Sequence, residues 1–92
     1  MSAQVKMYST RFCPYCIRAR MLLEAKGVAY EDIGVDGEPE RRREMMALSG
    51  RRTVPQIWVG DTHVGGYDDL AALEQQGSLD ELLETAPQAS WQ

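Results

Sequence analysis

Two cysteines stand three positions apart in the segment Cys13-Pro14-Tyr15-Cys16, and the chain has no others. At this spacing on the first turn of a helix, one thiol can attack a disulfide and the other can resolve the mixed disulfide that forms. A helix N-terminus favours the thiolate, because free N–H groups and a partial positive charge lie near the first sulfur. We therefore predict that Cys13 is the nucleophile and Cys16 the resolving thiol.

A zinc site and a structural disulfide are the two other uses that such a cysteine pair can have. Half of a zinc site needs two further ligands, and only His63 and a carboxylate are left to supply them. A structural disulfide over so short a loop removes little chain entropy. The redox interpretation is favoured over both.

The residues around the pair predict the elements that position it. Residues 4–8 alternate polar and apolar side chains, as a strand does. Pro14 suits the first turn of a helix, so we expect a helix from about Cys13 to a stop at Gly27. Residues 28–33 read as a second strand. A strand–helix–strand unit of this kind predicts a parallel pair with a right-handed crossover.

The second half of the chain predicts a charged helix from Pro39 to Ser49-Gly50, and then a hairpin around Gly60-Asp61. Two further helices are expected, from about Asp68 and from Ser78. The order β-α-β-α-β-β-α-α predicts an α/β fold with a four-stranded mixed sheet and helices on both faces. The methionines and leucines of the helices are expected in the core, and His63 is expected to face solvent.

The composition fits one small domain over residues 1–92, with a core of about 4–85 and a tail at 86–92. The chain is 43% hydrophobic and 26% charged, which excludes a disordered tail. We expect no membrane span and no signal peptide, since no apolar run approaches about 20 residues and residues 1–10 lack an apolar segment. A net charge of −4 argues against nucleic-acid binding.

The charge is unevenly distributed along the chain. All ten lysines and arginines lie between Lys6 and Arg52, whereas residues 61–92 hold acidic residues and no lysine or arginine. Two poles of opposite sign could orient a small zwitterion. The alternative is that charge merely marks solvent-exposed positions, and the uneven distribution alone favours that alternative.

Three motifs together resemble a known family. Cys13-Pro14-Tyr15-Cys16, Thr53-Val54-Pro55 and Gly65-Gly66-Tyr67-Asp68-Asp69 occur in the order and at the spacing of the dithiol glutaredoxins, and most resemble the small bacterial class. The resemblance covers about residues 4–85. It implies a thioredoxin-like fold and a glutathione-disulfide oxidoreductase of the cytoplasm, with glutathione as co-substrate and no tightly bound cofactor or metal.

The same resemblance implies the partners. These are glutathione and disulfide-containing or glutathionylated proteins, ribonucleotide reductase among them, and the chain is expected to act as a monomer.

The resemblance also implies a site for glutathione. It consists of Arg11, Cys13, Tyr15, Arg52, Thr53, Val54, Pro55, Gly66, Tyr67, Asp68 and Asp69. The family pattern implies a cis Val54–Pro55 bond that exposes a backbone edge to the extended tripeptide.

Several roles within this site stay open. The two aspartates either receive the γ-glutamyl end of glutathione or simply cap the following helix. Arg11 or Arg52 would take the glycyl carboxylate in place of the family's usual lysine, and each could equally be a solvated charge. Tyr67 stands where a smaller residue is common, which leaves its contact with the ligand in doubt.

Two alternative functions follow from related proteins. One is an iron–sulfur carrier that holds its cluster between two subunits through the first cysteine and glutathione; Pro14 argues against it. The other is a thioredoxin-like reductase served by a flavoprotein, and the double-glycine and aspartate turn argues against that.

Overall fold

The computed structural model describes residues 4–85. Its elements are β1 (Val5–Ser9), α1 (Pro14–Ala25), β2 (Tyr30–Gly34), α2 (Pro39–Ser49), β3 (Gln56–Val59), β4 (Thr62–Gly65), α3 (Tyr67–Gln75) and α4 (Ser78–Thr85). The predicted element order and the mixed four-stranded sheet are confirmed. The expected tail at residues 86–92 lies outside the described residues.

The strands lie in the order β2-β1-β3-β4. β1 and β2 are parallel, with Ser9 opposite Gly34, and α1 forms the crossover between them. β1 and β3 are antiparallel, and β3 and β4 form the predicted hairpin, in which Gly60 has a φ of +59°. The C-terminal ends of β1 and β2 therefore meet at one edge of the sheet, where α1 begins.

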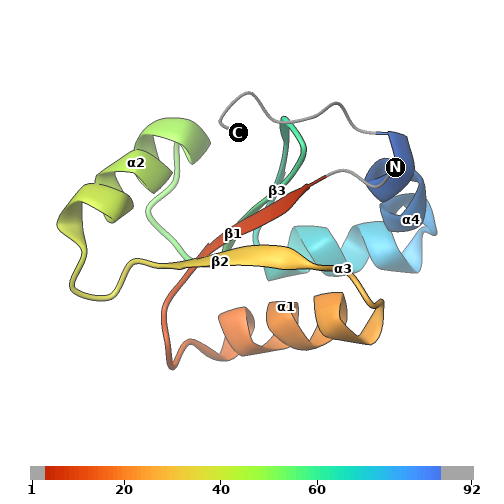
Figure 1. Ribbon diagram of the computed structural model, residues 1–92, viewed down its shortest axis with the longest axis horizontal. Coiled ribbons are helices and arrows are strands. Elements are labelled where there is room, and N and C mark those ends of the chain that lie inside the picture. The colour runs from red at the N-terminus through yellow and green to blue at the C-terminus, as the bar shows by residue number, and fades with distance from the viewer. Residues whose placement is uncertain (1–3, 86–92) are drawn as a thin grey trace.

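Alternate residues of the central strands build two cores. Val5 and Met7 of β1 pack into the larger core with side chains of α1, α3 and α4, whereas Tyr8 packs with Met45 of α2 on the other face. Figure 1 shows this division, with α2 on one side of the sheet and α1 with α3 on the opposite side. The result is the thioredoxin-like arrangement expected from the motifs.

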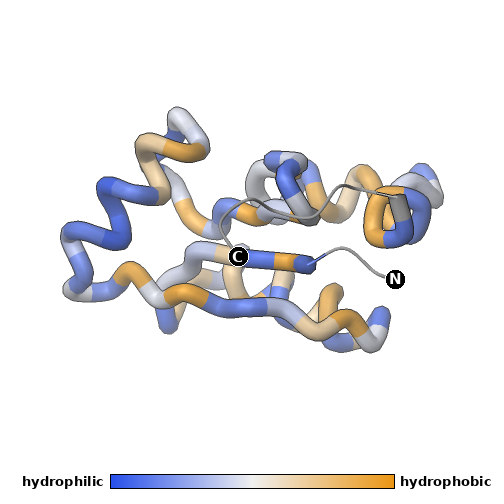
Figure 2. The backbone as a smooth tube through the Cα atoms, turned by 45° about the horizontal axis from the view of Figure 1, so that its top comes forward, coloured by the Kyte–Doolittle hydropathy of each residue, from blue (hydrophilic) through white to orange (hydrophobic). Residues whose placement is uncertain are grey.

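The expectation that the helical methionines and leucines are buried is wrong for several of them. α1 faces the sheet through Cys16, Ala19 and Leu23, while Met21 is 64% exposed. Ile17 and Met21 fit helical spacing as well, but both are exposed on a face of α1 other than the one that the small Ala19 brings against the sheet, whereas Leu22 is partly buried against the core. Leu48 of α2 is also exposed, and the first turns of that helix are among the most hydrophilic parts of the chain (Figure 2).

Within residues 4–85, no helix combines the length and the apolar character needed to cross a bilayer.

Candidate active site

Cys13 is the N-cap of α1, and Pro14 occupies the first helical position. The Cys13 carbonyl accepts the first helical hydrogen bond, from the N–H of Ile17 at 3.0 Å. Pro14 needs no partner for a backbone N–H, so the helix begins here at little cost. Cys13 is partly exposed, whereas Cys16 is fully buried one turn further on, and neither is in a disulfide.

The two thiols differ in acidity for physical reasons. Partial burial acts to raise the pKa of Cys13, but hydrogen bonds from Cys16 and from the backbone N–H of Tyr15 outweigh it and lower that pKa below its usual value. Burial raises the pKa of Cys16 to about 11, against the opposing effects of the Thr10 backbone and Arg20. A thiolate therefore forms more readily at Cys13 than at Cys16.

The segment before β3 lies beside the first thiol. The Val54–Pro55 bond is cis, as the family pattern implied, and the Cys13 Sγ lies 3.9 Å from the Val54 carbonyl oxygen. The buried Gln56 fixes this segment, because its Nε2 donates to the Thr53 carbonyl at 3.0 Å. The backbone that faces Cys13 is thus held from behind by the sheet.

His63 supports the same segment, which corrects the expectation that it faces solvent. Its Nε2 lies 2.8 Å from Gln56 Oε1, and its ring stacks on Trp58 with centroids 4.7 Å apart. The short hairpin places His63 opposite Trp58 in the sheet, on the face that α2 covers. Burial, and secondarily the charge of Arg51, lower the pKa of His63.

A groove of about 370 Å³ runs between the start of α1, the segment before β3 and the start of α3. It is lined by Tyr15, Arg51, Thr53, Val54, Pro55, Gly66, Tyr67, Asp68 and Asp69. The segment with the cis proline and the segment with the two aspartates therefore share one concave surface next to Cys13.

The far end of the groove is shaped by a glycine pair. Gly65 has a φ of +116°, and a side chain there would collide with the Asp69 carboxylate. That carboxylate accepts the Gly66 N–H at 3.0 Å and lies 3.3 Å from Arg51 Nη1. The Gly66 N–H and then Arg51 lower the pKa of Asp69, although burial opposes them. The aspartate therefore caps α3 while it stands at the groove.

Most of the predicted site residues line this groove, but Cys13 and two arginines do not. Cys13 adjoins the groove through its contact with the Val54 carbonyl. Arg11 lies in a second hollow, where its backbone N–H donates to Asp36 at 2.9 Å and its guanidinium stacks over Phe12. Arg52 is exposed, and its carbonyl accepts a hydrogen bond from Arg42 at 3.3 Å.

Sequence reasoning missed Arg51, which lines the groove in place of its neighbour Arg52. Nothing local separates the two adjacent arginines. The distinguishing feature is the ion pair between Arg51 and Asp69, which are 18 residues apart. Only the folded chain brings these two residues together.

The chemistry available here is nucleophilic attack by sulfur. An accessible thiol with a lowered pKa stands at one end of a groove, and a second thiol lies behind it. The groove offers backbone donors and acceptors together with charges of both signs, which suits an extended, zwitterionic peptide.

Comparison with known proteins points to a single family. A glutaredoxin family model matches residues 5–64. A glutaredoxin of Pseudomonas aeruginosa is 58% identical over 79 residues, which span 86% of this chain and 94% of that protein. The solution structure of a glutaredoxin from Brucella melitensis has a TM-score of 0.81 at 50% identity and covers 91% of each chain. The crystal structure of a buckwheat glutaredoxin–glutathione complex has a TM-score of 0.81 at 28% identity, over 88% of this chain and 76% of that one.

Proposed function

The chain belongs to the glutaredoxin family and is a glutathione-dependent thiol–disulfide oxidoreductase, in which we propose that Cys13 is the nucleophile and Cys16 the resolving thiol. The contrast between the two sulfurs carries the assignment. Cys13 is accessible and its pKa is lowered, while Cys16 is buried and its pKa is raised to about 11. The more accessible and more acidic thiol is the better attacking group near neutral pH.

For a glutathione mixed disulfide, the Cys13 thiolate attacks the sulfur of glutathione. The S–S bond of the substrate breaks, its electron pair leaves with the substrate sulfur, and that thiolate takes a proton from water. The thiolate of a second glutathione then attacks the glutathione sulfur of the Cys13 adduct. This step releases glutathione disulfide and returns the Cys13 thiolate.

For a protein disulfide, the Cys13 thiolate attacks one sulfur and releases the other as a thiol. Cys16, once deprotonated, attacks the sulfur of Cys13, which frees the reduced protein and closes a Cys13–Cys16 disulfide. Two molecules of glutathione then reduce that disulfide in two exchanges. Because Cys16 lies one helical turn from Cys13, this closure needs little movement of α1.

We propose that glutathione lies in the groove beside Cys13, on the residues expected from the sequence together with Arg51. The Val54 backbone edge suits the extended tripeptide, and Tyr15, two residues after Cys13, lines the same groove. The free N–H groups at the start of α3 suit the γ-glutamyl carboxylate, and Asp68 or Asp69 suits its ammonium. Gly66 leaves the backbone open to close approach.

The arginines divide between the two ends of the ligand in this proposal. Arg51 lies beside Asp69, so it serves the γ-glutamyl carboxylate. For the glycyl carboxylate we retain Arg11 and Arg52 as alternatives, although neither lines the groove.

The assignment of the nucleophile is tested by two single substitutions. With a mixed disulfide of glutathione and a small thiol as substrate, Cys13→Ser should abolish turnover and Cys16→Ser should leave much of it. Cys16 takes no part in the two-step route above, so it is the matched control. Retention of activity by Cys13→Ser would refute the assignment.

We propose further that the protein acts as a monomer in the cytoplasm on disulfide-containing or glutathionylated proteins, with ribonucleotide reductase as one partner. A dithiol that glutathione must return to the reduced state requires a compartment with a reducing glutathione pool. The comparisons support the oxidoreductase and do not favour the iron–sulfur carrier over it.

A further inference from the structure

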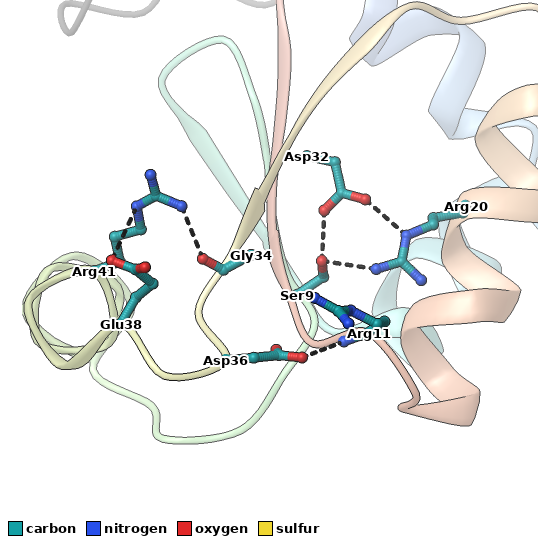
Figure 3. A pocket seen from close by; sticks show the side chains of 8 residues that line it. All are labelled: Ser9, Arg11, Arg20, Asp32, Gly34, Asp36, Glu38 and Arg41. Atoms are coloured by element: carbon teal, nitrogen blue, oxygen red, sulfur yellow. Dashed lines mark hydrogen bonds and ion pairs between the residues drawn. The ribbon is translucent and has the colours of Figure 1, made fainter.

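A second hollow lies at the C-terminal ends of β1 and β2, separate from the groove described above. Figure 3 shows its lining, with the Arg20 side chain reaching from α1 toward the ends of both strands. Arg20 stands four residues after Cys16 and so on the same side of α1. No residue lines both this hollow and the groove beside Cys13.

Arg20 joins three segments of the chain through one guanidinium group. Its Nε lies 2.7 Å from Asp32 Oδ2 on β2, and its Nη2 donates to Ser9 Oγ at 2.8 Å and to the Thr10 carbonyl at 3.1 Å. Ser9, which is 1% exposed, completes the set by donating its hydroxyl hydrogen to the other oxygen of Asp32. The planar group of arginine makes these bonds in different directions at once, which a lysine ammonium on a flexible stem does less well.

The segment that Arg20 holds is the end of β1, and Arg20 lies one helical turn after Cys16 on α1. Thr10 follows β1 directly, its carbonyl accepts a hydrogen bond from Arg20, and its backbone acts to lower the pKa of the buried Cys16 thiol. The positive charge of Arg20 also acts on both sulfurs and lowers the pKa of each. Arg20 thus affects the dithiol through the backbone and through its charge, without lying in the groove.

We propose that Arg20 is a positioning residue for the dithiol, which fixes the end of β1 against Cys16 and stabilises negative charge on the Cys13 and Cys16 sulfurs. The inference rests on the proposed role of Cys13 as the nucleophile. It adds a residue on α1 that touches neither glutathione nor the reacting sulfur.

The charges around Arg20 determine in which direction each substitution should shift the pKa of Cys13. Asp32 on β2 partly neutralises Arg20, and Asp36, Glu38, Arg11 and Arg41 line the same hollow. Replacing Arg20 by a neutral residue removes a positive charge, whereas Asp32→Asn leaves that charge in place and removes the negative one beside it. A charge effect predicts opposite shifts for the two variants. Simple loosening of the fold predicts shifts in the same direction.

The experiment measures the rate of Cys13 alkylation by iodoacetamide against pH on the reduced full chain, with the modified residue identified by mass spectrometry. The variants are Arg20→Met, Arg20→Lys, Asp32→Asn and the control Arg41→Met. Arg41 lines the same hollow, and among residues 4–85 its bonds go to the Gly34 carbonyl and, at 3.9 Å, to Glu38, and not to the dithiol or to Asp32. Urea unfolding of each variant accompanies the alkylation.

In Arg20→Met, we expect the midpoint of the profile to rise by about half a pH unit, so that alkylation below the midpoint is about threefold slower. Asp32→Asn should lower the midpoint, Arg20→Lys should restore most of the wild-type value, and Arg41→Met should match the wild type. An unchanged midpoint in a folded Arg20→Met protein, or a rise in both Arg20→Met and Asp32→Asn, would overturn the proposal. If Arg20→Met does not fold, the other two variants test the proposal. A lowered midpoint in Asp32→Asn with a near-wild-type midpoint in Arg20→Lys would support it, and a raised or unchanged midpoint in Asp32→Asn would overturn it.

The outcome is distinguishable from a failure of the proposed function. If Cys13 were not the nucleophile, Cys13→Ser would remain active whatever the behaviour of Arg20. If only the present inference fails, Cys13→Ser is inactive and the Arg20→Met profile coincides with that of the wild type.

Discussion

The Cys13 sulfur lies 3.9 Å from the carbonyl oxygen of Val54, across 41 positions of sequence. This contact is favourable only while Cys13 carries its proton, because a thiol can donate to a carbonyl and a thiolate cannot. On ionisation, the sulfur depends instead on the N–H groups of Tyr15 and Cys16 at the start of α1. The Cys13 thiolate is therefore held by the helix, and the Val54 carbonyl then no longer accepts a hydrogen bond from this sulfur.

We predict from this arrangement that iodoacetamide distinguishes the two cysteines. At about pH 7.5, Cys13 should be labelled faster than a free thiol of ordinary pKa, because the lowered pKa of Cys13 leaves a larger fraction of it as thiolate. Cys16 should stay unlabelled, since it is buried and its pKa is raised to about 11. Peptide mass spectrometry of the labelled chain measures both.

Unfolding provides the control for this labelling. In strong denaturant, the two cysteines should react at similar rates, because both then have ordinary thiol environments. Equal labelling of the two in the folded protein would contradict the description of Cys13 as the exposed, acidic thiol.

A second prediction concerns the ion pair at the far end of the groove. Arg51→Gln should raise the KM for a small glutathione mixed disulfide about two- to fivefold, a modest effect because Arg51 and Asp69 are each about half exposed. The effect on kcat should be small, since Arg51 does not contact the reacting sulfur. Steady-state kinetics at low and high salt measure the change, and the wild-type KM should depend more on salt than that of the variant.

Arg43→Gln is the matched control for Arg51→Gln. Arg43 is an exposed arginine of α2 and does not line the groove. Both variants lose one positive charge from the same half of the chain. An equal rise in KM for the two would attribute the effect to net charge and not to the groove.

Much of the fold was predictable because its signals are local. The Cys13-Pro14-Tyr15-Cys16 segment marks the start of α1, and the glycines around the hairpin mark turns that few other residues allow. The order of strands and helices then restricts the sheet to few topologies. The cis Val54–Pro55 bond followed from the family motif and not from local chemistry, which would have favoured trans.

The features that the sequence did not predict depend on contacts between residues far apart in the chain. Arg51 and Arg52 are equivalent in sequence until Asp69 is placed, and Arg20 is one more charged helical residue until the ends of β1 and β2 meet beside it. Met21 fits a helical apolar pattern, yet the sheet contacts another face of α1. His63 was expected on the surface because the pairing that stacks it on Trp58 depends on the register of β3 and β4.

A third prediction compares the two glycines before α3. Gly65→Ala should lower the free energy of unfolding by about 1–3 kcal/mol, because its φ is positive and its new Cβ would displace the Asp69 carboxylate that caps the helix. Gly66→Ala should change it by about 0.5 kcal/mol or less, since Gly66 has an ordinary backbone conformation and the nearest atom is 3.5 Å away. Urea unfolding with equal m-values measures both, and similar losses in the two variants would show that the close approach of Asp69 is unimportant.

The last prediction concerns His63 and the dependence of stability on pH. Burial, and then the charge of Arg51, hold the pKa of His63 in the folded protein below its ordinary value, so the unfolded chain binds a proton first as the pH falls. The contribution of the neutral, folded histidine is therefore complete above about pH 6.5 and is lost as the pH falls from there through the lower pKa of the folded state.

Replacing His63 by glutamine removes this titration and keeps a side chain that can bond Gln56. We expect the free energy of unfolding of the wild type to fall more steeply than that of His63→Gln between about pH 7 and pH 5, whatever the offset between them at pH 7. Urea titrations at several pH values give both curves. Their difference isolates His63, because every other titrating group is common to the two proteins. Parallel curves would mean that His63 takes up its proton equally well in the folded and the unfolded chain, in conflict with its stacking on Trp58 and its bond to the buried Gln56.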